Sequence, residues 1–168
     1  MGTEIERKYL ADRPHLEPFV PPGTNIMQGY ITVSPQEVRL RREDGKCTLT
    51  VKSVSMLVRS EYEIELTDDQ FEGLWPATHG NRVEKSRSTV DAQGHSASLD
   101  VYSGRLQGLR TIEVEFADIN AAESFDPPPW FGPEVTYNES YKNRSLASLG
   151  SISALQDPGE RHLRTSQP

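Results

Sequence analysis

Acidic residues two positions apart stand at both ends of the strand-like part of this sequence. Glu4 and Glu6 belong to the opening run E-I-E-R-K, and Glu113 and Glu115 belong to the run I-E-V-E-F. Side chains two apart share one face of a β-strand, so each run presents a pair of carboxylates to one side. Oxygen ligands of this kind suit hard divalent cations, and their repetition indicates a charged interior.

The runs between these pairs also carry charges of one sign on their polar faces. A solvated face usually mixes signs along each strand, because like charges on neighbouring positions repel each other. In this chain the acids are grouped at Glu61, Glu63 and Glu65, and the bases are grouped at Arg39 and Arg41, at Lys52, and at Lys85 and Arg87. This segregation favours polar faces that line an enclosed, water-filled space.

A linear chain of phosphates suits such a lumen. Guanidinium groups bind phosphate oxygens bidentately, and Lys supplies compact positive charges. The residues that could make these contacts are Lys8, Arg39, Arg41, Lys52, Lys85 and Arg87. The carboxylates would repel phosphates directly, so they need a bridging cation, and Mg²⁺ or Mn²⁺ takes oxygen ligands from carboxylates and phosphates together. The acids and bases together therefore predict a metal and a polyphosphate.

Alternating strand patterns must position these side chains, and they cover most of the chain. The runs are 3–9, 26–33, 37–43, 46–53, 59–66, 82–90, 96–102 and 111–117. Asp44-Gly45 between two such runs predicts a tight hairpin. The last run but two, 82–90, carries Lys85 and Arg87 on one face and mostly polar residues on the other. We therefore expect it to be an edge strand or a poorly covered one.

Helix signals are fewer. Thr67 followed by Gln70 predicts an N-cap with a capping box, and the helix would end at Pro76. Further short helices are expected near Ala121 and over about 143–150. The stretch between residues 12 and 25 is rich in proline, which breaks a helix in its interior, so this stretch is predicted to be a loop.

A sheet of about eight strands with few helices needs closure to avoid exposed edges. We therefore predict a mainly β (α+β) fold, an eight-stranded antiparallel closed β-barrel or tunnel. Its charged faces would line the lumen, and its apolar faces, among them Tyr62 and Ile64, would point outward under a few short helices. The alternative is an ordinary antiparallel sheet with its charged face in water.

Composition sets the class of protein. The 168 residues suit one domain, predicted to span 1–150, with a flexible polar tail over 151–168. The 25 Asp and Glu outnumber the 18 Lys and Arg, which argues against a general nucleic-acid binder. Cys47 is alone and is expected to be a buried, inert thiol. With no apolar signal region and no run long enough to span a bilayer, we expect a cytoplasmic protein that does not bind membranes.

The opening E-I-E-R-K is similar to the ExExK signature of the CYTH superfamily, also called triphosphate tunnel metalloenzymes. Further motifs follow in that family's order and spacing: R-L-R at 39–41, T-V-K at 50–52, R-S-E-Y-E at 59–63, E-K-S-R at 84–87, L-D-V-Y at 99–102, G-L-R-T-I-E-V-E-F at 108–116 and Y-K-N-R-S-L-A at 141–147. The resemblance covers nearly the whole chain up to Gly150. It implies an eight-stranded tunnel that acts on triphosphate compounds with a divalent metal.

Carried over residue by residue, the resemblance implies that the metal ligands are Glu4, Glu6, Glu61, Glu63, Glu113 and Glu115. The phosphate ligands are the six basic residues named above. Glu65 and Lys46 stand near strand ends and are expected to be solvated rim residues, and Asp100 has the alternative of a simple pair with a neighbouring base. For Arg59 and Lys142, the choice between a ligand of the site and a structural or solvated residue stays open. The proline-rich stretch departs from the family, because it leaves little room for the helix often found after the first strand.

The resemblance implies hydrolysis of inorganic tripolyphosphate to diphosphate and phosphate, by a metal-activated water. Glu63 and Lys52 are the candidates for accepting its proton. The alternatives within the family are a class IV adenylate cyclase and a thiamine triphosphatase. The alternative outside enzymes is a non-catalytic binder of polyphosphate or nucleotides, although such a binder gains nothing from carboxylates that repel its ligand. The expected partner is a small triphosphate compound, and the protein would be a monomer or homodimer.

Overall fold

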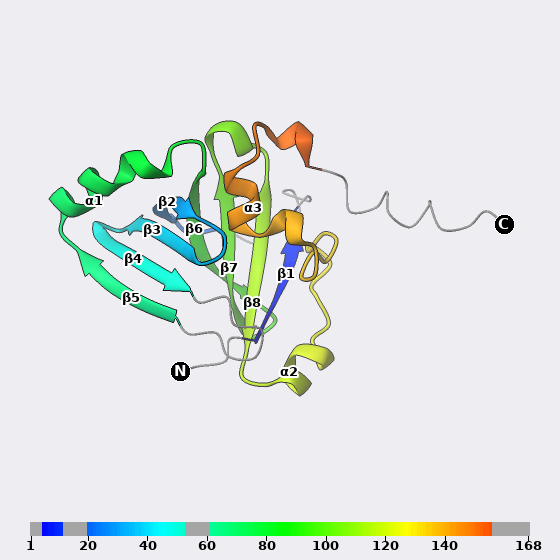
Figure 1. Cartoon of the computed structure of the whole chain (residues 1–168). Coiled ribbons are helices and arrows are strands. Elements are labelled where there is room, and N and C mark those ends of the chain that lie inside the picture. Colours follow the sequence, from blue (N-terminus) through cyan, green and yellow to red (C-terminus); the bar gives the residue numbers. More distant parts are fainter. Residues whose placement is uncertain (1–4, 12–19, 53–60, 156–168) are drawn as a thin grey trace.

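One curved antiparallel sheet organises the molecule (Figure 1). The computed structural model describes residues 5–11, 20–52 and 61–155. The strands are β1 (Ile5–Leu10), β2 (Thr24–Thr32), β3 (Glu37–Glu43), β4 (Lys46–Lys52), β5 (Glu61–Leu66), β6 (Arg82–Ala92), β7 (His95–Tyr102) and β8 (Arg110–Phe116). All eight predicted strands are confirmed, and they form one sheet in the order β1-β8-β7-β6-β2-β3-β4-β5.

The predicted closure of this sheet is not confirmed. In the described part of the chain no pairing joins β1 to β5, so these two strands are the edges. The polar face of β1 carries Glu6, and the polar face of β5 carries Glu61 and Glu63. If β1 and β5 paired, these like charges would face each other and destabilise the pairing. The structure is therefore an open, curved sheet.

Two tight turns set the register of the hairpins. Asp44 and Gly45 both have positive φ, 48° and 75°, as the predicted Asp-Gly hairpin requires. A second turn of the same kind, at Gln93 and Gly94 with φ of 57° and 87°, joins β6 to β7. β6 continues up to this second turn and ends at Ala92, two residues beyond the end of the predicted run 82–90.

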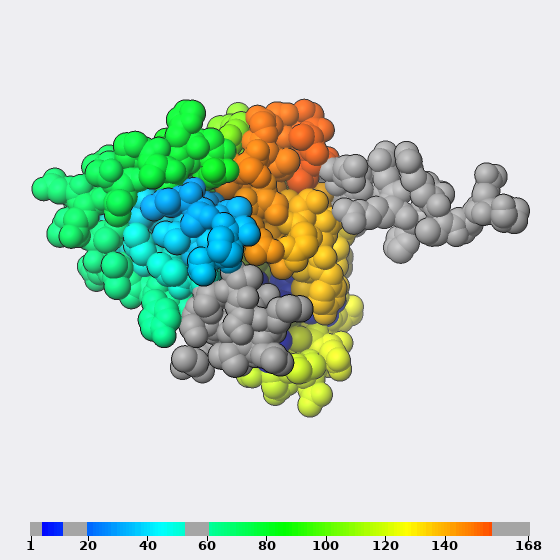
Figure 2. All heavy atoms as spheres, in the orientation of Figure 1, coloured from blue at the N-terminus to red at the C-terminus, as the bar shows by residue number. Residues whose placement is uncertain are grey.

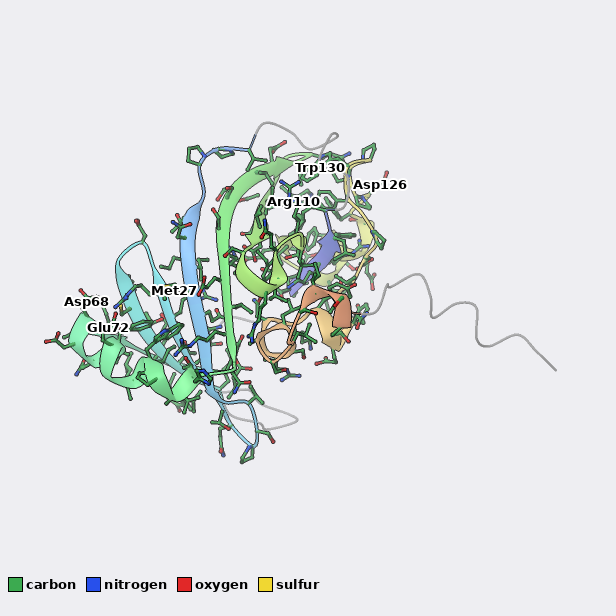
Figure 3. All side chains as sticks on the ribbon, turned by 90° about the horizontal axis from the view of Figure 1, so that it is seen from above. Met27, Asp68, Glu72, Arg110, Asp126 and Trp130 are labelled. Atoms are coloured by element: carbon green, nitrogen blue, oxygen red, sulfur yellow. The ribbon has the colours of Figure 1, made fainter. Side chains whose placement is uncertain are left out.

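The convex face of the sheet carries most of the apolar core. At one end, Leu40 and Cys47 pack against Phe71 of α1 (Asp68–Leu74), with the 3-10 helix η2 (Trp75–Thr78) beside it. At the other end, α2 (Ile119–Ser124) and Phe125 cover a larger cluster around Ile112. The prediction that Cys47 is buried is confirmed. In Figure 3, Asp68 and Glu72 of α1 lie on the opposite side of the molecule from Asp126 and Trp130.

The predicted capping box begins α1. The backbone N–H of Gln70 donates to the side-chain oxygen of Thr67 at 3.2 Å, and the backbone N–H of Thr67 donates to the side chain of Gln70 at 2.9 Å. These two bonds satisfy groups that a helix start leaves unpaired. The helix stops at Leu74, ahead of Pro76, as the sequence indicates.

The C-terminal segment fills one end of the concave face, and this corrects the prediction that all short helices lie outside. α3 (Asn143–Ala147) follows the 3-10 helix η4 (Glu139–Tyr141) and stops three residues before the predicted end. Leu146 and Ala147 pack with Tyr30, Val83 and Tyr102, which face the concave side. Apolar and aromatic side chains on that face need cover from water, which explains the position of α3. Figure 2 shows this orange segment against the blue β2–β3 region.

Two expectations about individual strands need correction. Of the two alternatives for residues 82–90, the edge strand is wrong, because β6 pairs with both β2 and β7. The outer face of β5 is not covered by a helix, since Tyr62 and Ile64 are 67% and 56% exposed. β5 is at the sheet's edge, and the core cluster beside it includes only Leu66 from this strand.

Ordered chain continues past Gly150, the predicted domain boundary. The 3-10 helix η5 (Ile152–Ala154) and Leu155 follow, and Ile152 and Leu155 pack against the α3 cluster. The remainder of the predicted tail lies outside the described residues, as do Glu4, Arg59 and most of the proline-rich stretch. In the part of the chain that the structure describes, no helix is long and apolar enough to cross a membrane.

Gly29 and Gly73 provide a matched test of the packing. A Cβ at Gly29 would lie 2.6 Å from Cβ of Thr78, whereas a Cβ at Gly73 has no atom within 4 Å. We expect Gly29→Ala to reduce the free energy of unfolding by about 1–3 kcal/mol, because β2 and η2 must move apart. Gly73→Ala lies in α1 and should raise it by roughly 0.5–1 kcal/mol. Urea denaturation of both variants measures the difference, and equal effects would contradict this packing.

Candidate active site

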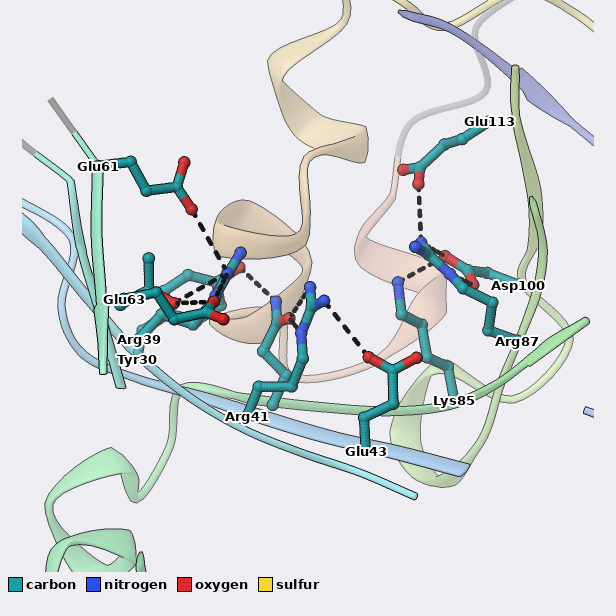
Figure 4. A network of polar contacts seen from close by, with 12 residues as sticks. Tyr30, Arg39, Arg41, Glu43, Glu61, Glu63, Lys85, Arg87, Asp100 and Glu113 are labelled. Carbon is teal, nitrogen blue, oxygen red and sulfur yellow. Dashed lines mark hydrogen bonds and ion pairs between the residues drawn. The ribbon is translucent and has the colours of Figure 1, made fainter. Parts of the chain in front are cut away.

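Charged side chains from both ends of the sheet point into the concave face (Figure 4). Arg39, Arg41, Glu61 and Glu63 come from β3 and β5, and Lys85, Arg87, Asp100 and Glu113 come from β6, β7 and β8. The two groups influence each other. Burial, followed by the positive charges of Arg39 and, more weakly, Arg87, lowers the pKa of Arg41. Cations from both groups therefore act on one shared space.

Strand register assembles the group on β3, β4 and β5. Arg39, Thr50 and Glu63 are direct neighbours across the three strands. Lys52 of β4 is likewise the direct neighbour of Glu61 on β5. Arg39 Nη2 donates to Thr50 Oγ1 at 3.1 Å, and Thr50 Oγ1 donates to Glu63 Oε2 at 3.1 Å. Lys52 Nζ lies 3.0 Å from Glu61 Oε2. Arg39 lies 3.9 Å from both acids, so its charge is only loosely paired.

The group on β6, β7, β8 and β1 is a buried ion network. Asp100 is fully buried and accepts from Lys85 Nζ at 2.5 Å and from Arg87 Nε and Nη2 at 2.7 Å each. Glu113 accepts from Arg87 Nη2 at 2.8 Å and lies 2.9 Å from Lys8 Nζ. Three bases thus share two acids, which leaves a net positive charge.

The pKa values follow from this network. Burial alone would raise the pKa of Glu113, but the charges of Lys8, Lys85 and Arg87 lower it to about 2. Burial alone would lower the pKa of Arg87, but the hydrogen bonds to Asp100 and the negative charges of Asp100 and Glu113 raise it. Burial, aided by the charge of Arg87, lowers the pKa of Lys85 against the opposing effect of Asp100. Glu113 and Arg87 are therefore ionised at neutral pH.

Arg41 lies between the two groups and is held by β2. Gln28 Oε1 accepts from Arg41 Nε at 2.9 Å and from Arg41 Nη2 at 2.8 Å, and Gln28 Nε2 donates to the Tyr30 hydroxyl at 2.6 Å. Sequence reasoning did not select Gln28 or Tyr30. The sequence feature that could have pointed to Gln28 is its place on the same strand face as Ile26 and Tyr30, because a polar side chain among large buried ones needs hydrogen-bond partners.

The structure brings the predicted phosphate ligands to one concave face, but with different access. The side chains of Arg41 and Arg87 are about a quarter exposed, at 23% and 24%, whereas that of Lys85 is 0% exposed against Asp100. Asp100 therefore pairs with neighbouring bases, as one of the two expectations stated. The predicted rim residues Glu65 and Lys46 are exposed at strand ends.

The predicted metal ligands do not form one cluster in this structure. Glu6 and Glu115 stand directly opposite each other on β1 and β8, with Glu113 next along β8. Glu61 and Glu63 lie on the other edge strand, and Glu4 is outside the described residues. Among the residues that the structure describes, no group of three His, Cys, Asp or Glu is close enough to hold a metal ion. Open sheet edges account for this separation.

A cavity of about 210 Å³ opens beside Arg41. Its lining consists of Arg41, Glu43, Lys46, Thr48 and Glu63. Every one of these side chains is charged or carries a hydroxyl group. The cavity therefore suits a small, strongly polar ligand better than an apolar one.

Comparison with known proteins places this site in a family. No family model matches the chain. The inorganic triphosphatase of Nitrosomonas europaea is 48% identical over 149 residues, covering 86% of this chain and 97% of that protein. The inorganic triphosphatase of Acetivibrio thermocellus is 34% identical over 149 residues, covering 87% and 94%. The chain belongs to the inorganic triphosphatases of the CYTH superfamily. The predicted resemblance is thereby confirmed.

A crystal structure supports the same assignment for the fold of this CYTH protein. The inorganic triphosphatase NE1496 superposes with a TM-score of 0.74 at 42% sequence identity, over 90% of this chain and 98% of that chain. The fold of the curved sheet is therefore shared with this inorganic triphosphatase.

The chemistry of the acids on the concave face suits a hard divalent cation, which prefers carboxylate oxygens. Two of these acids, Glu6 and Glu115, are in register on the paired strands β1 and β8. Arg39 Nε is buried and makes no hydrogen bond, so the site also retains a donor for an anion. A buried donor without a partner destabilises the protein, and an oxyanion ligand would remove that penalty.

Asp100 tests whether the ion network holds the concave face together. Asp100→Asn would leave the Lys85 charge buried without its carboxylate and would remove one of the two carboxylates that bind Arg87, so we expect the free energy of unfolding to fall by about 3–5 kcal/mol. Glu139→Gln is the control, because Glu139 pairs with Lys142 and Arg144 at the surface and should contribute no more than about 1 kcal/mol. Urea denaturation compares them, and equally small losses would show that the network is not structural.

Proposed function

We propose that this protein hydrolyses inorganic tripolyphosphate to diphosphate and phosphate with Mg²⁺ or Mn²⁺ as cofactor. The observation that carries the proposal is the concave face itself, where the cations of Arg39, Arg41, Lys85 and Arg87 lie among carboxylates from both ends of the sheet. The relatives named inorganic triphosphatase support it. A phosphate chain needs the cations, and the acids need a metal beside that chain.

The basic residues would bind the phosphate chain. Arg39 and Arg41 have donors that are only loosely paired with acids, so they are the first candidates for phosphate contacts. Lys8, Lys52 and Arg87 would add positive charge from the flanks. Lys85, whose amine is enclosed with Asp100, stays a predicted phosphate ligand, and in this structure it supports Asp100 and, through it, Arg87.

The acids would hold the metal once the two edges approach. Glu6, Glu113 and Glu115 lie on one side and Glu61 and Glu63 on the other, with Glu4 as the sixth predicted ligand. A bound divalent ion would neutralise the phosphate chain and lower the pKa of a water for attack on a terminal phosphorus. Since a cation removes the repulsion between acids on β1 and β5, we propose that ligand binding favours the closed tunnel.

The protein must also accept the proton of the attacking water. Glu63 and Lys52 are the candidates, and each already has a partner, Thr50 and Glu61 respectively. Since a carboxylate oxygen can take up a proton directly, Glu63 is the first candidate of the two.

The alternatives differ in what must lie beside the phosphates. A class IV adenylate cyclase needs space for an adenine ring, and a thiamine triphosphatase needs space for thiamine. The cavity next to Arg41 is lined by charged and hydroxyl side chains, which favours phosphate over a ring. A non-catalytic binder of polyphosphate or nucleotides would bind the same compounds without turnover.

The remaining proposals concern the chain as a whole. We propose one catalytic domain over residues 1–150, extended by the contacts of Ile152 and Leu155, and a tail that is not needed for catalysis. The acidic excess supports a protein that does not bind nucleic acid. We propose a cytoplasmic monomer or homodimer that does not bind membranes.

A parallel assay tests the function. Tripolyphosphate, ATP and thiamine triphosphate are offered separately with Mg²⁺ and with Mn²⁺, and released phosphate and the other products are measured. We expect fastest turnover of tripolyphosphate and none in excess EDTA, because without a cation the carboxylates repel the substrate. Full activity in EDTA would refute the metal mechanism. Cyclic AMP from ATP would identify a cyclase, and binding without turnover would identify a receptor.

Two substitutions separate substrate binding from metal chemistry. Arg41→Ala removes a phosphate contact made before and during the reaction, so KM for tripolyphosphate should rise about tenfold or more. Glu115→Gln keeps the shape but removes a charge from a metal ligand, so kcat should fall most. Both should fold, since neither side chain belongs to a core cluster. Steady-state kinetics with circular dichroism measures both effects, and unfolding of either variant would make these charges structural.

A further inference from the structure

Gln28 is a fully buried amide on the polar face of β2. It lies in register between Arg41 of β3 and Val83 of β6. Its carbonyl oxygen accepts two N–H groups of Arg41, at 2.9 Å and 2.8 Å, and its amide nitrogen donates to the Tyr30 hydroxyl at 2.6 Å. Burying an amide is unfavourable unless its groups are hydrogen-bonded, and here both ends are.

The donor pattern determines which way the amide points. Arg has donors only, so the Gln28 oxygen must face Arg41 and the Gln28 nitrogen must face Tyr30. Burial raises the pKa of the Tyr30 hydroxyl, so this phenol stays neutral and its oxygen accepts the bond. The three side chains therefore form one ordered chain from Tyr30 to the guanidinium.

Two of the arginines on the concave face, Arg87 and Arg41, are held by groups of different charge. Arg87 uses Nε and Nη2 to bind the carboxylate of Asp100. Arg41 uses the same two nitrogens, but its acceptor is the neutral carbonyl of Gln28. The nearest ion-pair partner of Arg41 is Glu43, at 3.6 Å from Nη1. The geometry of Arg41 is thus as constrained as that of Arg87, while its charge is less neutralised.

We propose that Gln28 is a positioning residue that holds the Arg41 guanidinium with a neutral acceptor, so that its charge remains available to the phosphate chain. This inference rests on the proposed function of the site. Nε and Nη2 are fixed by the amide, and Arg41 lines the adjoining cavity with Thr48 and Lys46. A carboxylate at position 28 would hold the same fork and cancel the charge.

Substitutions at Gln28 separate the two parts of this role. Gln28→Leu removes the acceptor, and we expect KM for tripolyphosphate to rise about tenfold, with a smaller effect on kcat. Gln28→Glu keeps size and acceptor but neutralises Arg41, so KM should rise as well. If Gln28→Leu folds poorly, Gln28→Glu carries the test, because it can still hold the fork. An unchanged KM in a folded Gln28→Glu protein would overturn the proposal.

A double-mutant cycle shows whether Gln28 acts through Arg41. In an Arg41→Ala background, Gln28→Leu should change KM by less than about twofold, because the group it positions is gone. Multiplicative effects of the two substitutions would instead show a merely structural role. Thr78→Val is the matched control, since Thr78 is a buried polar residue that packs on Gly29 and binds Arg82 on the opposite face of β2. It should lower the melting temperature and leave KM unchanged.

Binding measurements keep this inference distinct from the proposed function. The affinity of each variant for tripolyphosphate is measured by calorimetry with Mg²⁺, beside turnover. If the wild-type protein binds tripolyphosphate without hydrolysing it, the proposed function fails, and the same cycle on the dissociation constant decides the role of Gln28. If the wild-type protein neither binds nor hydrolyses tripolyphosphate, both proposals fail.

Discussion

Charges on the concave face need partners of opposite sign, because curving the sheet removes much of the water that would otherwise solvate them. The network of Lys85, Asp100, Arg87 and Glu113 shows how the protein meets this constraint. An unpaired charge at the depth of Asp100 would destabilise the fold by several kcal/mol. The strand register must therefore place acids and bases side by side, and the rest of the structure depends on that register.

Apolar packing keeps the register in place from both sides of the sheet. On the convex face, α1 and α2 each cover a separate core cluster. On the concave face, α3 packs on Tyr30, Val83 and Tyr102 and covers one end of that face. The charged side chains are thus confined to the part of the concave face that α3 leaves open. The position of this small helix limits the space in which a phosphate chain could lie.

The charge of each basic residue depends on the group that holds it. A carboxylate binds Arg87 and compensates its charge, so this residue is part of the ion network that stabilises the concave face. A neutral amide fixes Arg41 and leaves more of its charge uncompensated. The two sides of the concave face therefore differ in how far their cations are neutralised by acids, and not in their exposure to solvent, which is 23% for the Arg41 side chain and 24% for that of Arg87.

The sequence by itself determined the strands, the Asp44-Gly45 hairpin and the capped helix after Thr67, because alternation, turn residues and caps are local properties of the chain. It also determined the charged face, since side chains two apart on a strand share a side. The E-x-E-x-K pattern and its companions sufficed to identify the family, which the relatives confirm.

Only the tertiary structure decided which charges meet. Lys85 and Asp100 are 15 residues apart and lie on different strands, and their enclosure depends on register and curvature that no local pattern encodes. The same holds for Gln28, which an amide-in-strand pattern alone would not connect to Arg41. The open edges, the exposed outer face of β5 and the place of α3 on the concave side also depend on long-range packing, so periodicity could not predict them.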